Sequence, residues 1–247
     1  MIILKTEKEL AIMAKAGRIA GECLLRLGEM VKPGLRTIDL DRAAEEFIRS
    51  KGAIPTFKGY MGFPGSICAS KNEVVVHGVP GETILEEGDI ISIDVGATFQ
   101  GFVGDTAATF PVGEVSPDAK KLIEVTKDAL NKGIAAALVG AHIGDIGCAI
   151  EGFVKEHGYS VVKDYAGHGV GRSMHEDPMV PNYGRLGTGP ALRKGMVIAI
   201  EPMVNAGGSD VITFPDMRVI TRDRSWSGHF EHTVAITEKG PVCLTLV

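Results

Sequence analysis

An internal repeat constrains the fold of this chain more than any other feature of its sequence. Leu85-Glu-Glu-Gly-Asp-Ile-Ile-Ser-Ile-Asp94 and Leu192-Arg-Lys-Gly-Met-Val-Ile-Ala-Ile-Glu201 share a leucine, a glycine, an apolar alternation and a terminal acid at an offset of 107 residues. Upstream, residues 39–52 and 145–158 share Asp, Ala, Glu, Phe and Gly at an offset of 106. Nearly equal offsets predict two similar halves, about 4–112 and 113–247. The alternative is a chance likeness between amphipathic helices and buried strands.

Each half begins with helical patterns and continues with strand patterns. Thr6-Glu-Lys-Glu9 has the form of a capping box, and Ser116-Pro117 supplies an N-cap and a first-turn proline. Second helices are predicted over Thr37–Ser50 and Gly144–Glu156, each followed by a glycine that suits a helix end. Helices followed by strands, twice, predict an α+β fold in which helices pack outside a curved, mainly antiparallel sheet with a pseudo-two-fold repeat. Strands are predicted where β-branched residues occur in short runs, over residues 73–79, 89–97, 102–110, 196–204 and 230–237.

Ionisable residues interrupt otherwise apolar, strand-like segments at five places. An unpaired buried carboxylate protonates unless a cation or hydrogen-bond donors hold it charged. Four carboxylates and one imidazole that converge would therefore favour a pair of bound metal ions. A donor set so rich in oxygen favours Mn, Fe(II) or Co, and leaves Zn as an alternative. The five residues are Asp94, Asp105, His168, Glu201 and Glu231.

The first two of these carboxylates flank a predicted hairpin. Gly101 and the polar Gln100 suit its turn. We expect Asp94 and Asp105 to face each other across two antiparallel strands, with their backbones roughly 5 Å apart. Opposed like charges destabilise a sheet unless they are neutralised, and residues 90–110 contain no Lys or Arg. A divalent cation explains the pair better than two solvated acids beside a turn.

A glycine-rich motif carries two histidines seven residues apart. His168 and His175 lie in Gly167-His-Gly-Val-Gly-Arg-Ser-Met-His-Glu176. Its glycine density predicts loop and strand rather than helix, and lets the backbone approach a site closely. A buried, hydrogen-bonded structural role is the alternative for either imidazole.

The composition excludes several kinds of protein. With 247 residues, 45% of them hydrophobic and 23% charged, the chain can bury an extensive core. A net charge of −5 offers no overall basic field for nucleic acid. No apolar run approaches the roughly 20 residues needed to span a bilayer. Four scattered cysteines without a C-x-x-C pair argue against a zinc knot or a disulfide scaffold. We expect a cytoplasmic protein with no membrane partner and no direct nucleic-acid motif.

These motifs resemble those of the methionine aminopeptidases of the prokaryotic, type I form, within the creatinase-like or pita-bread hydrolases. The resemblance runs along essentially the whole chain. The sequence has no long insertion between His168 and Glu231, as type II enzymes have, and no added N-terminal domain, as prolidases and aminopeptidase P usually have. The motifs that carry it are Asn72-Glu-Val-Val-Val-His-Gly-Val-Pro80, Ser92-Ile-Asp-Val-Gly96, Gly104-Asp-Thr-Ala107, Gly167-His-Gly-Val-Gly171, His175-Glu-Asp-Pro178, Ile200-Glu-Pro202 and Phe230-Glu-His-Thr233.

The resemblance implies a role for each of the five ionisable residues. Asp94 would chelate one metal, and Asp105 and Glu231 would bridge two. His168 and Glu201 would complete the second site. Hydroxide bridging the two divalent metals would then attack the scissile carbonyl.

Three catalytic roles are also implied by the resemblance. Glu201 would shuttle the proton, His175 would stabilise the tetrahedral oxyanion, and His77 would contact the peptide at the cleaved bond. No role carries over to the other four histidines, which are His142, His157, His229 and His232.

The pocket for a methionine side chain is matched by an apolar, polarizable segment, with Tyr60, Phe63 and Cys68 in the family's positions. Simple core packing is the alternative for these side chains. Three further residues would shape the pocket. Phe57 stands where some members have a smaller side chain, whereas Met174 and Met217 stand where bacterial members often have aromatic ones.

The resemblance implies a metal-dependent aminopeptidase that removes the initiator methionine from nascent proteins and peptides. It would act as a single catalytic domain spanning residues 1–247, as a monomer, with transient ribosome contact. Two alternatives are a related exopeptidase of the prolidase or aminopeptidase P kind, and a non-catalytic pita-bread binding protein. Such binding proteins typically lose metal ligands, whereas all five residues are present here.

Overall fold

Four α-helices form, two of them starting where capping signals predict, in a computed structural model that describes residues 1–247. In the capping box before the first helix, the Glu9 N–H donates to the Thr6 hydroxyl and the Thr6 N–H donates to the Glu9 carboxylate. Ser116 accepts a hydrogen bond from the Ala119 N–H at the start of the third helix. The helices are α1 (Glu7–Met30), α2 (Thr37–Ser50), α3 (Pro117–Ala136) and α4 (Ile143–Glu156).

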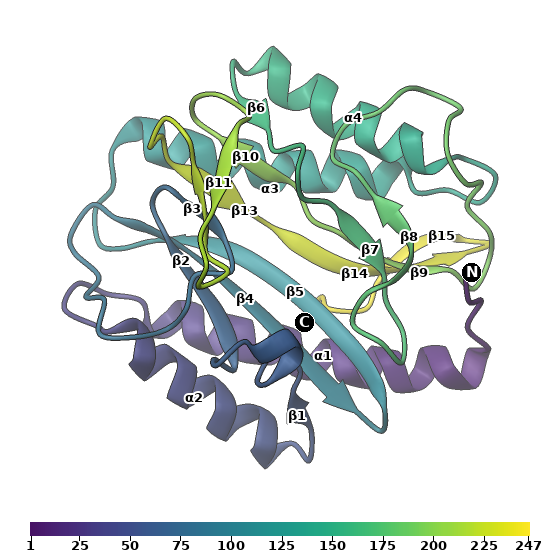
Figure 1. The fold of residues 1–247 in the computed structure, drawn as a ribbon. Coiled ribbons are helices and arrows are strands. Elements are labelled where there is room, and N and C mark those ends of the chain that lie inside the picture. The colour runs from purple at the N-terminus through teal and green to yellow at the C-terminus, as the bar shows by residue number, and fades with distance from the viewer.

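A nine-stranded antiparallel sheet runs through the centre of the molecule (Figure 1). Its order is β1-β4-β5-β14-β9-β7-β8, with β2 paired to β4 and β15 paired to β14. The strands of this sheet are β1 (Ile54–Pro55), β2 (Ile67–Lys71), β4 (Ile90–Phe99), β5 (Phe102–Pro111), β7 (Gly167–Gly169), β8 (Glu176–Val180), β9 (Val197–Ile200), β14 (Glu231–Thr237) and β15 (Gly240–Cys243).

Two three-stranded sheets lie beside it, in the orders β13-β10-β6 and β11-β12-β3. Their strands are β3 (Val74–Val76), β6 (Ser160–Val161), β10 (Met203–Asn205), β11 (Val211–Thr213), β12 (Val219–Thr221) and β13 (Ser227–His229). A short 3₁₀ turn, η1 (Tyr60–Gly62), precedes β2.

The two helix pairs cover the large sheet at opposite ends of the view in Figure 1, with α1 and α2 below and α3 and α4 above. Each pair encloses its own hydrophobic core. Leu24 and Leu40 pack with Ile93 of β4 in one core. In the other core, Leu122 and Ile150 pack with the isoleucines of β9. Because each core removes its apolar helix faces from water, both halves hold the shared sheet in place.

The internal repeat is visible in the backbone. Helices α2 and α4 begin and end 106 residues apart. The Gly34 N–H donates to the Leu85 carbonyl at 2.7 Å, and the Gly140 N–H donates to the Leu192 carbonyl at 2.9 Å. The predicted α+β fold with its pseudo-two-fold repeat and curved antiparallel sheet is therefore confirmed.

The predicted register of the central hairpin is wrong by two residues. Asp94 pairs with Ala107, and Asp105 pairs with Gly96. A turn that opposed the two acids directly would need Phe99 at a central position, where a positive φ is required. Instead Gln100 and Gly101, with φ of 48° and 77°, form the turn. Since side chains alternate with a period of two, both acids still project from one face of the hairpin, as diagonal neighbours.

The predicted strand over residues 196–204 is also divided. It forms β9 and β10, which belong to different sheets, and Pro202 lies between them. Proline has no N–H to donate to a sheet ladder, so the chain leaves the large sheet here. Glu201 lies at this break.

Candidate metal centre

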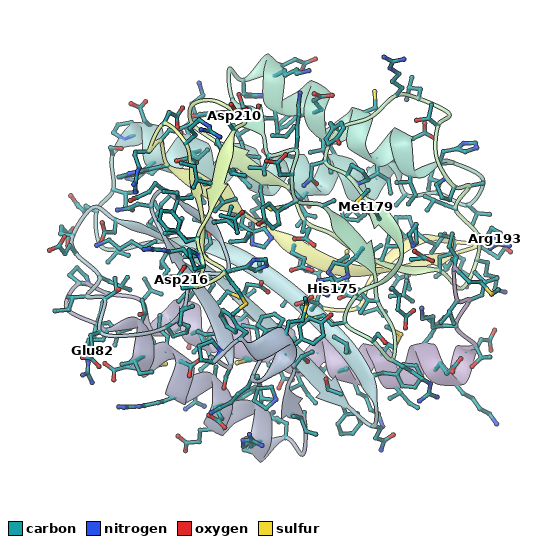
Figure 2. The ribbon with its side chains drawn as sticks, in the orientation of Figure 1. Glu82, His175, Met179, Arg193, Asp210 and Asp216 are labelled. Atoms are coloured by element: carbon teal, nitrogen blue, oxygen red, sulfur yellow. The ribbon has the colours of Figure 1, made fainter.

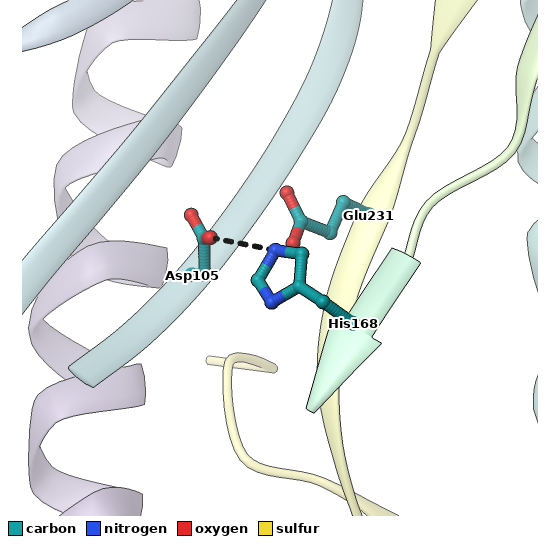
Figure 3. Close-up of side chains that lie close together, drawn as sticks. All are labelled: Asp105, His168 and Glu231. Carbon is teal, nitrogen blue, oxygen red and sulfur yellow. Dashed lines mark ion pairs between the residues drawn. The ribbon is translucent and has the colours of Figure 1, made fainter. Parts of the chain in front are cut away.

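Strands β5, β14 and β7 of the large sheet bring Asp105, Glu231 and His168 together in the interior (Figure 3). One ligand atom from each lies within 4.8 Å of the other two, and all three residues are buried. The His168 Nε2 is 3.9 Å from the Asp105 Oδ2. The backbone beneath is fixed, because the Asp105 N–H donates to the Thr233 hydroxyl, which in turn donates to the Asp105 carbonyl.

The other two predicted residues complete the cluster. Glu201 Oε1 lies 3.5 Å from His168 Nε2. Asp94 and Glu201 line one cavity, and Asp94 lies on the same face of the hairpin as Asp105. The structure thus brings together all five residues singled out from the sequence, two from the first half and three from the second. Their roles as metal ligands stay predictions.

Ionising all the carboxylates of this cluster at once is electrostatically unfavourable. Burial raises the pKa of Asp94 from 3.8 to about 7, and the nearby Glu201 charge adds to the effect. Burial also raises the pKa of Asp105 and Glu231 well above their ordinary values, as do the charges of the other carboxylates. Burial acts to raise the pKa of Glu201, but the close approach of the His229 ring and the charge of His168 outweigh it, so the pKa is lowered.

Three buried carboxylate oxygens without hydrogen-bond partners are suited to binding a divalent metal ion. Asp94 Oδ1, Asp105 Oδ1 and Glu231 Oε1 are buried and make no hydrogen bond. Within the cluster the only ion pairs join a carboxylate to a histidine, so no Lys or Arg neutralises it. Buried oxygens that lack both donors and counter-charges are costly, and an oxygen-rich set with one imidazole fits a divalent cation.

The two predicted catalytic histidines lie beside the cluster. The His175 ring centroid is 4.3 Å from that of His168, and its Nδ1 is 2.8 Å from the Tyr60 hydroxyl. Burial and the neighbouring His168 lower the pKa of His175 to about 4. His77 follows β3 with a φ of 60° and lines the same cavity, and burial lowers its pKa as well. Both imidazoles are neutral at physiological pH, and each can donate one hydrogen bond.

A buried ion pair fastens the loop that carries His175. Lys5 Nζ lies 2.6 Å from Glu176 Oε2, and the side chains are only 3% and 8% exposed. The other Glu176 oxygen accepts hydrogen bonds from the N–H groups of Arg172 and Ser173. In Figure 2 His175 lies near the middle of the view, whereas Glu82 and Arg193 lie at its edges.

A cavity of about 480 Å³ opens onto the cluster. Its walls include Asp94, Glu201, His77 and His175. The rest of the lining is mainly aromatic and sulfur-containing. Burial raises the pKa of the Cys68 thiol, so this thiol stays uncharged. All six predicted pocket residues contribute to the lining, namely Phe57, Tyr60, Phe63, Cys68, Met174 and Met217.

The sequence interpretation missed His229, which lies in this site. It is 2% exposed and lines the cavity, and its Nε2 is 3.5 Å from Glu201 Oε2. One signal could have identified it. His229 precedes Glu231 by two residues, the spacing that places side chains on one face of an extended segment.

This fold and this site define a metal-dependent hydrolase whose two halves share one acid-rich centre. Residues 11–238 match the model of metallopeptidase family M24. A methionine aminopeptidase from Clostridium acetobutylicum is 53% identical over 100% of this chain and 99% of its own. The crystal structure of methionine aminopeptidase from Rickettsia prowazekii has a TM-score of 0.98 at 46% identity and covers 100% of both chains. The chain belongs to metallopeptidase family M24 and, within it, to the methionine aminopeptidases.

A prolidase from Pyrococcus furiosus shares the fold at greater distance. Its TM-score is 0.81 at 27% identity, over 99% of this chain but only 66% of the prolidase. The pita-bread architecture is thus common to both kinds of enzyme, whereas full-length correspondence is found with the methionine aminopeptidases. None of the helices has the length and apolar character that crossing a membrane requires.

Proposed function

We propose that this chain is a metal-dependent aminopeptidase that removes the N-terminal methionine from nascent proteins and peptides. The observation that carries the proposal is the meeting of five ionisable residues from both halves beside a mainly apolar cavity, two of which, Asp94 and Glu201, line its wall. Since neither half contains the whole set, residues 1–247 would act as a single catalytic domain with halves 4–112 and 113–247.

Two divalent ions, Mn, Fe(II) or Co with Zn as the alternative, would be held by this set. Asp94 would bind one ion, Asp105 and Glu231 would bridge both, and His168 and Glu201 would complete the second site. The orphaned buried oxygens of three of these carboxylates support the assignment. When bound, the metal pair supplies Lewis acidity toward the scissile carbonyl and a nucleophile derived from water at neutral pH.

The chain's own residues would then handle protons and developing charge. The Tyr60 hydroxyl can donate to His175 Nδ1, which leaves the proton of the neutral ring on Nε2. In that tautomer His175 is a donor for the oxyanion of the tetrahedral intermediate. His77 would hydrogen-bond the peptide at the cleaved bond, and the charged Glu201 would accept a proton and pass it to the leaving amine.

The cavity would receive the methionine side chain. An unbranched thioether packs well against aromatic rings and against other sulfur-containing side chains. Phe57, Phe63 and Cys68 form a small buried cluster, with Met174 and Met217 packed against it. Flexible methionines at two of these positions, rather than rigid aromatics, would let the pocket adjust its shape.

The proposed substrate also implies where the protein acts and what it contacts. Nascent chains present their initiator methionine as they leave the ribosome, so the protein would act in the cytoplasm, as a monomer, with transient ribosome contact and without membrane or direct nucleic-acid binding.

Peptide cleavage tests the proposal against its alternatives. Metal-loaded protein is incubated with Met-Ala-Ser and with an Xaa-Pro dipeptide, and free amino acids are quantified. We expect methionine release from the first substrate and none from the second. Cleavage of the Xaa-Pro peptide alone would select a prolidase-like activity, and inertness toward both peptides at full metal loading would select a binding protein.

A further inference from the structure

His229 has a buried ring nitrogen without a partner. Its Nε2 makes no hydrogen bond, and the residue is 2% exposed. Glu201 Oε2 lies 3.5 Å from this nitrogen. A small movement would turn this long contact into a hydrogen bond, and catalytic hydrogen bonds often tighten in this way only when a site is loaded.

The Glu201 carboxylate is bracketed by two imidazoles. His168 Nε2 lies 3.5 Å from Oε1, and His229 Nε2 lies 3.5 Å from Oε2. The Glu201 backbone is held too, because Asn182 Nδ2 donates to its carbonyl at 2.9 Å. One carboxylate oxygen therefore lies beside His168 of the cluster, while the other lies beside His229.

The backbone of His229 is anchored to the other half of the molecule. Its N–H donates to Thr109 Oγ1 at 2.8 Å, and its carbonyl accepts from the same hydroxyl at 2.9 Å. Thr109 Oγ1 also lies 2.8 Å from Ser92 Oγ. With one hydrogen to give and two lone pairs to receive, the Thr109 hydroxyl is fully used when Ser92 donates to it. Hydrogen bonds to side chains of β4 and β5 thus fix the backbone that carries the His229 imidazole.

We propose that His229 is a positioning residue that holds Glu201 Oε2, so that Oε1 alone is presented to the metal centre. The inference rests on the proposed role of Glu201 as a metal ligand. Partners that orient a ligating carboxylate or imidazole contribute about 10- to 100-fold to metal affinity. His229 would also keep the Glu201 carboxylate aligned for proton transfer without touching the substrate.

Three substitutions separate this role from simple packing. His229→Ala and His229→Phe both remove the donor, and the second keeps a ring in the space. His229→Gln keeps a side-chain N–H that can reach Oε2. The matched control is His232→Gln, since His232 is three residues away, bonds Thr245 Oγ1 through Nδ1, and lines a different cavity between α1 and α3.

Metal affinity is measured by calorimetric titration of Co(II) into each metal-free protein, without peptide. We expect His229→Ala and His229→Phe to bind one of the ions about 10- to 100-fold more weakly, and His229→Gln and His232→Gln to stay within about threefold of the parent protein. With saturating metal, kcat for Met-Ala-Ser should fall in the two donor-lacking variants while KM stays within about twofold, because the effect is on a transition-state interaction.

Two outcomes would overturn the inference. Unchanged Co(II) affinity and kcat in both donor-lacking variants would mean that the contact has no function. Loss of one ion in His229→Gln as severe as in His229→Ala, with an altered cobalt absorption spectrum at saturation, would mean that His229 is itself a ligand. If one donor-lacking variant fails to fold, as circular dichroism would reveal, the other decides. Failure of the parent protein to release methionine refutes the proposed function and leaves this affinity test standing.

Discussion

Replacing Asp94 by asparagine is expected to stabilise the metal-free protein at neutral pH while weakening its metal site. Burial raises the pKa of Asp94 from 3.8 to about 7. Between these values the folded state holds a proton that the unfolded chain releases. Stability contributed by this group is therefore complete below pH 3.8 and is lost as the pH rises through about 7.

The size of the effect follows from that difference of about three pH units. At 1.36 kcal/mol per pH unit, ionised Asp94 costs the metal-free fold about 4 kcal/mol as an upper bound. A buried amide still lacks some hydrogen bonds, so we expect Asp94→Asn to gain about 1–2 kcal/mol, or about 2–8 °C in Tm for a chain of this size.

Thermal unfolding of chelator-treated protein near pH 7.5 and near pH 4.5 measures this gain. The difference between Asp94→Asn and the parent protein should be largest near neutrality and should shrink in acid. Asp89→Asn is the matched control. Asp89 pairs with Lys71 at 2.6 Å and accepts bonds from Asn72 and the Glu86 N–H, which hold its pKa below its usual range, so its replacement should destabilise the fold. A metal-free Asp94→Asn protein no more stable than the parent near pH 7.5 would refute the reasoning.

Three further perturbations test other parts of the site. His168→Ala should abolish metal binding and peptidase activity while circular dichroism remains native, and full activity would contradict its role. Lys5→Met should lower the free energy of unfolding in urea by about 3–5 kcal/mol, because it leaves Glu176 charged and buried. Combining Lys5→Met with Glu176→Gln should recover much of that loss. Equal stability of the single and double variants would argue against a stabilising role for the ion pair. Tyr60→Phe should lower kcat several-fold with little change in KM, since it removes the hydroxyl on His175 Nδ1, and an unchanged kcat would show that the tautomer needs no such partner.

The helices and the ligand candidates could be predicted from sequence because their signals are local. A capping box at Thr6 and a Ser-Pro pair at 116–117 define helix starts whatever the tertiary context. Carboxylates such as Asp105 and Glu231 stand out because burial makes them costly within an apolar strand. The internal offset added that residues from both halves would meet, and the structure brings them together.

Register and cross-sheet contacts were harder to predict. The hairpin depends on which two residues tolerate positive φ, and Gln100-Gly101 tolerates it better than Phe99-Gln100, a choice the carboxylate spacing does not reveal. The proximity of His229 to Glu201 depends on the break at Pro202. After this break the chain enters β10, which pairs with β13, the strand that carries His229. Such a contact joins residues 28 positions apart through two short strands, and no periodic pattern records it.

Metal-dependent release of methionine tests directly whether the buried acid cluster is a catalytic metal centre. Chelator-treated protein is titrated with Mn(II) or Co(II) while free methionine from Met-Ala-Ser is measured. We expect no release without metal, activity that rises as the centre fills, and loss of that activity in Asp105→Asn. Undiminished release in the metal-free protein, or the same activity in Asp105→Asn, would show that the cluster is not a catalytic metal centre.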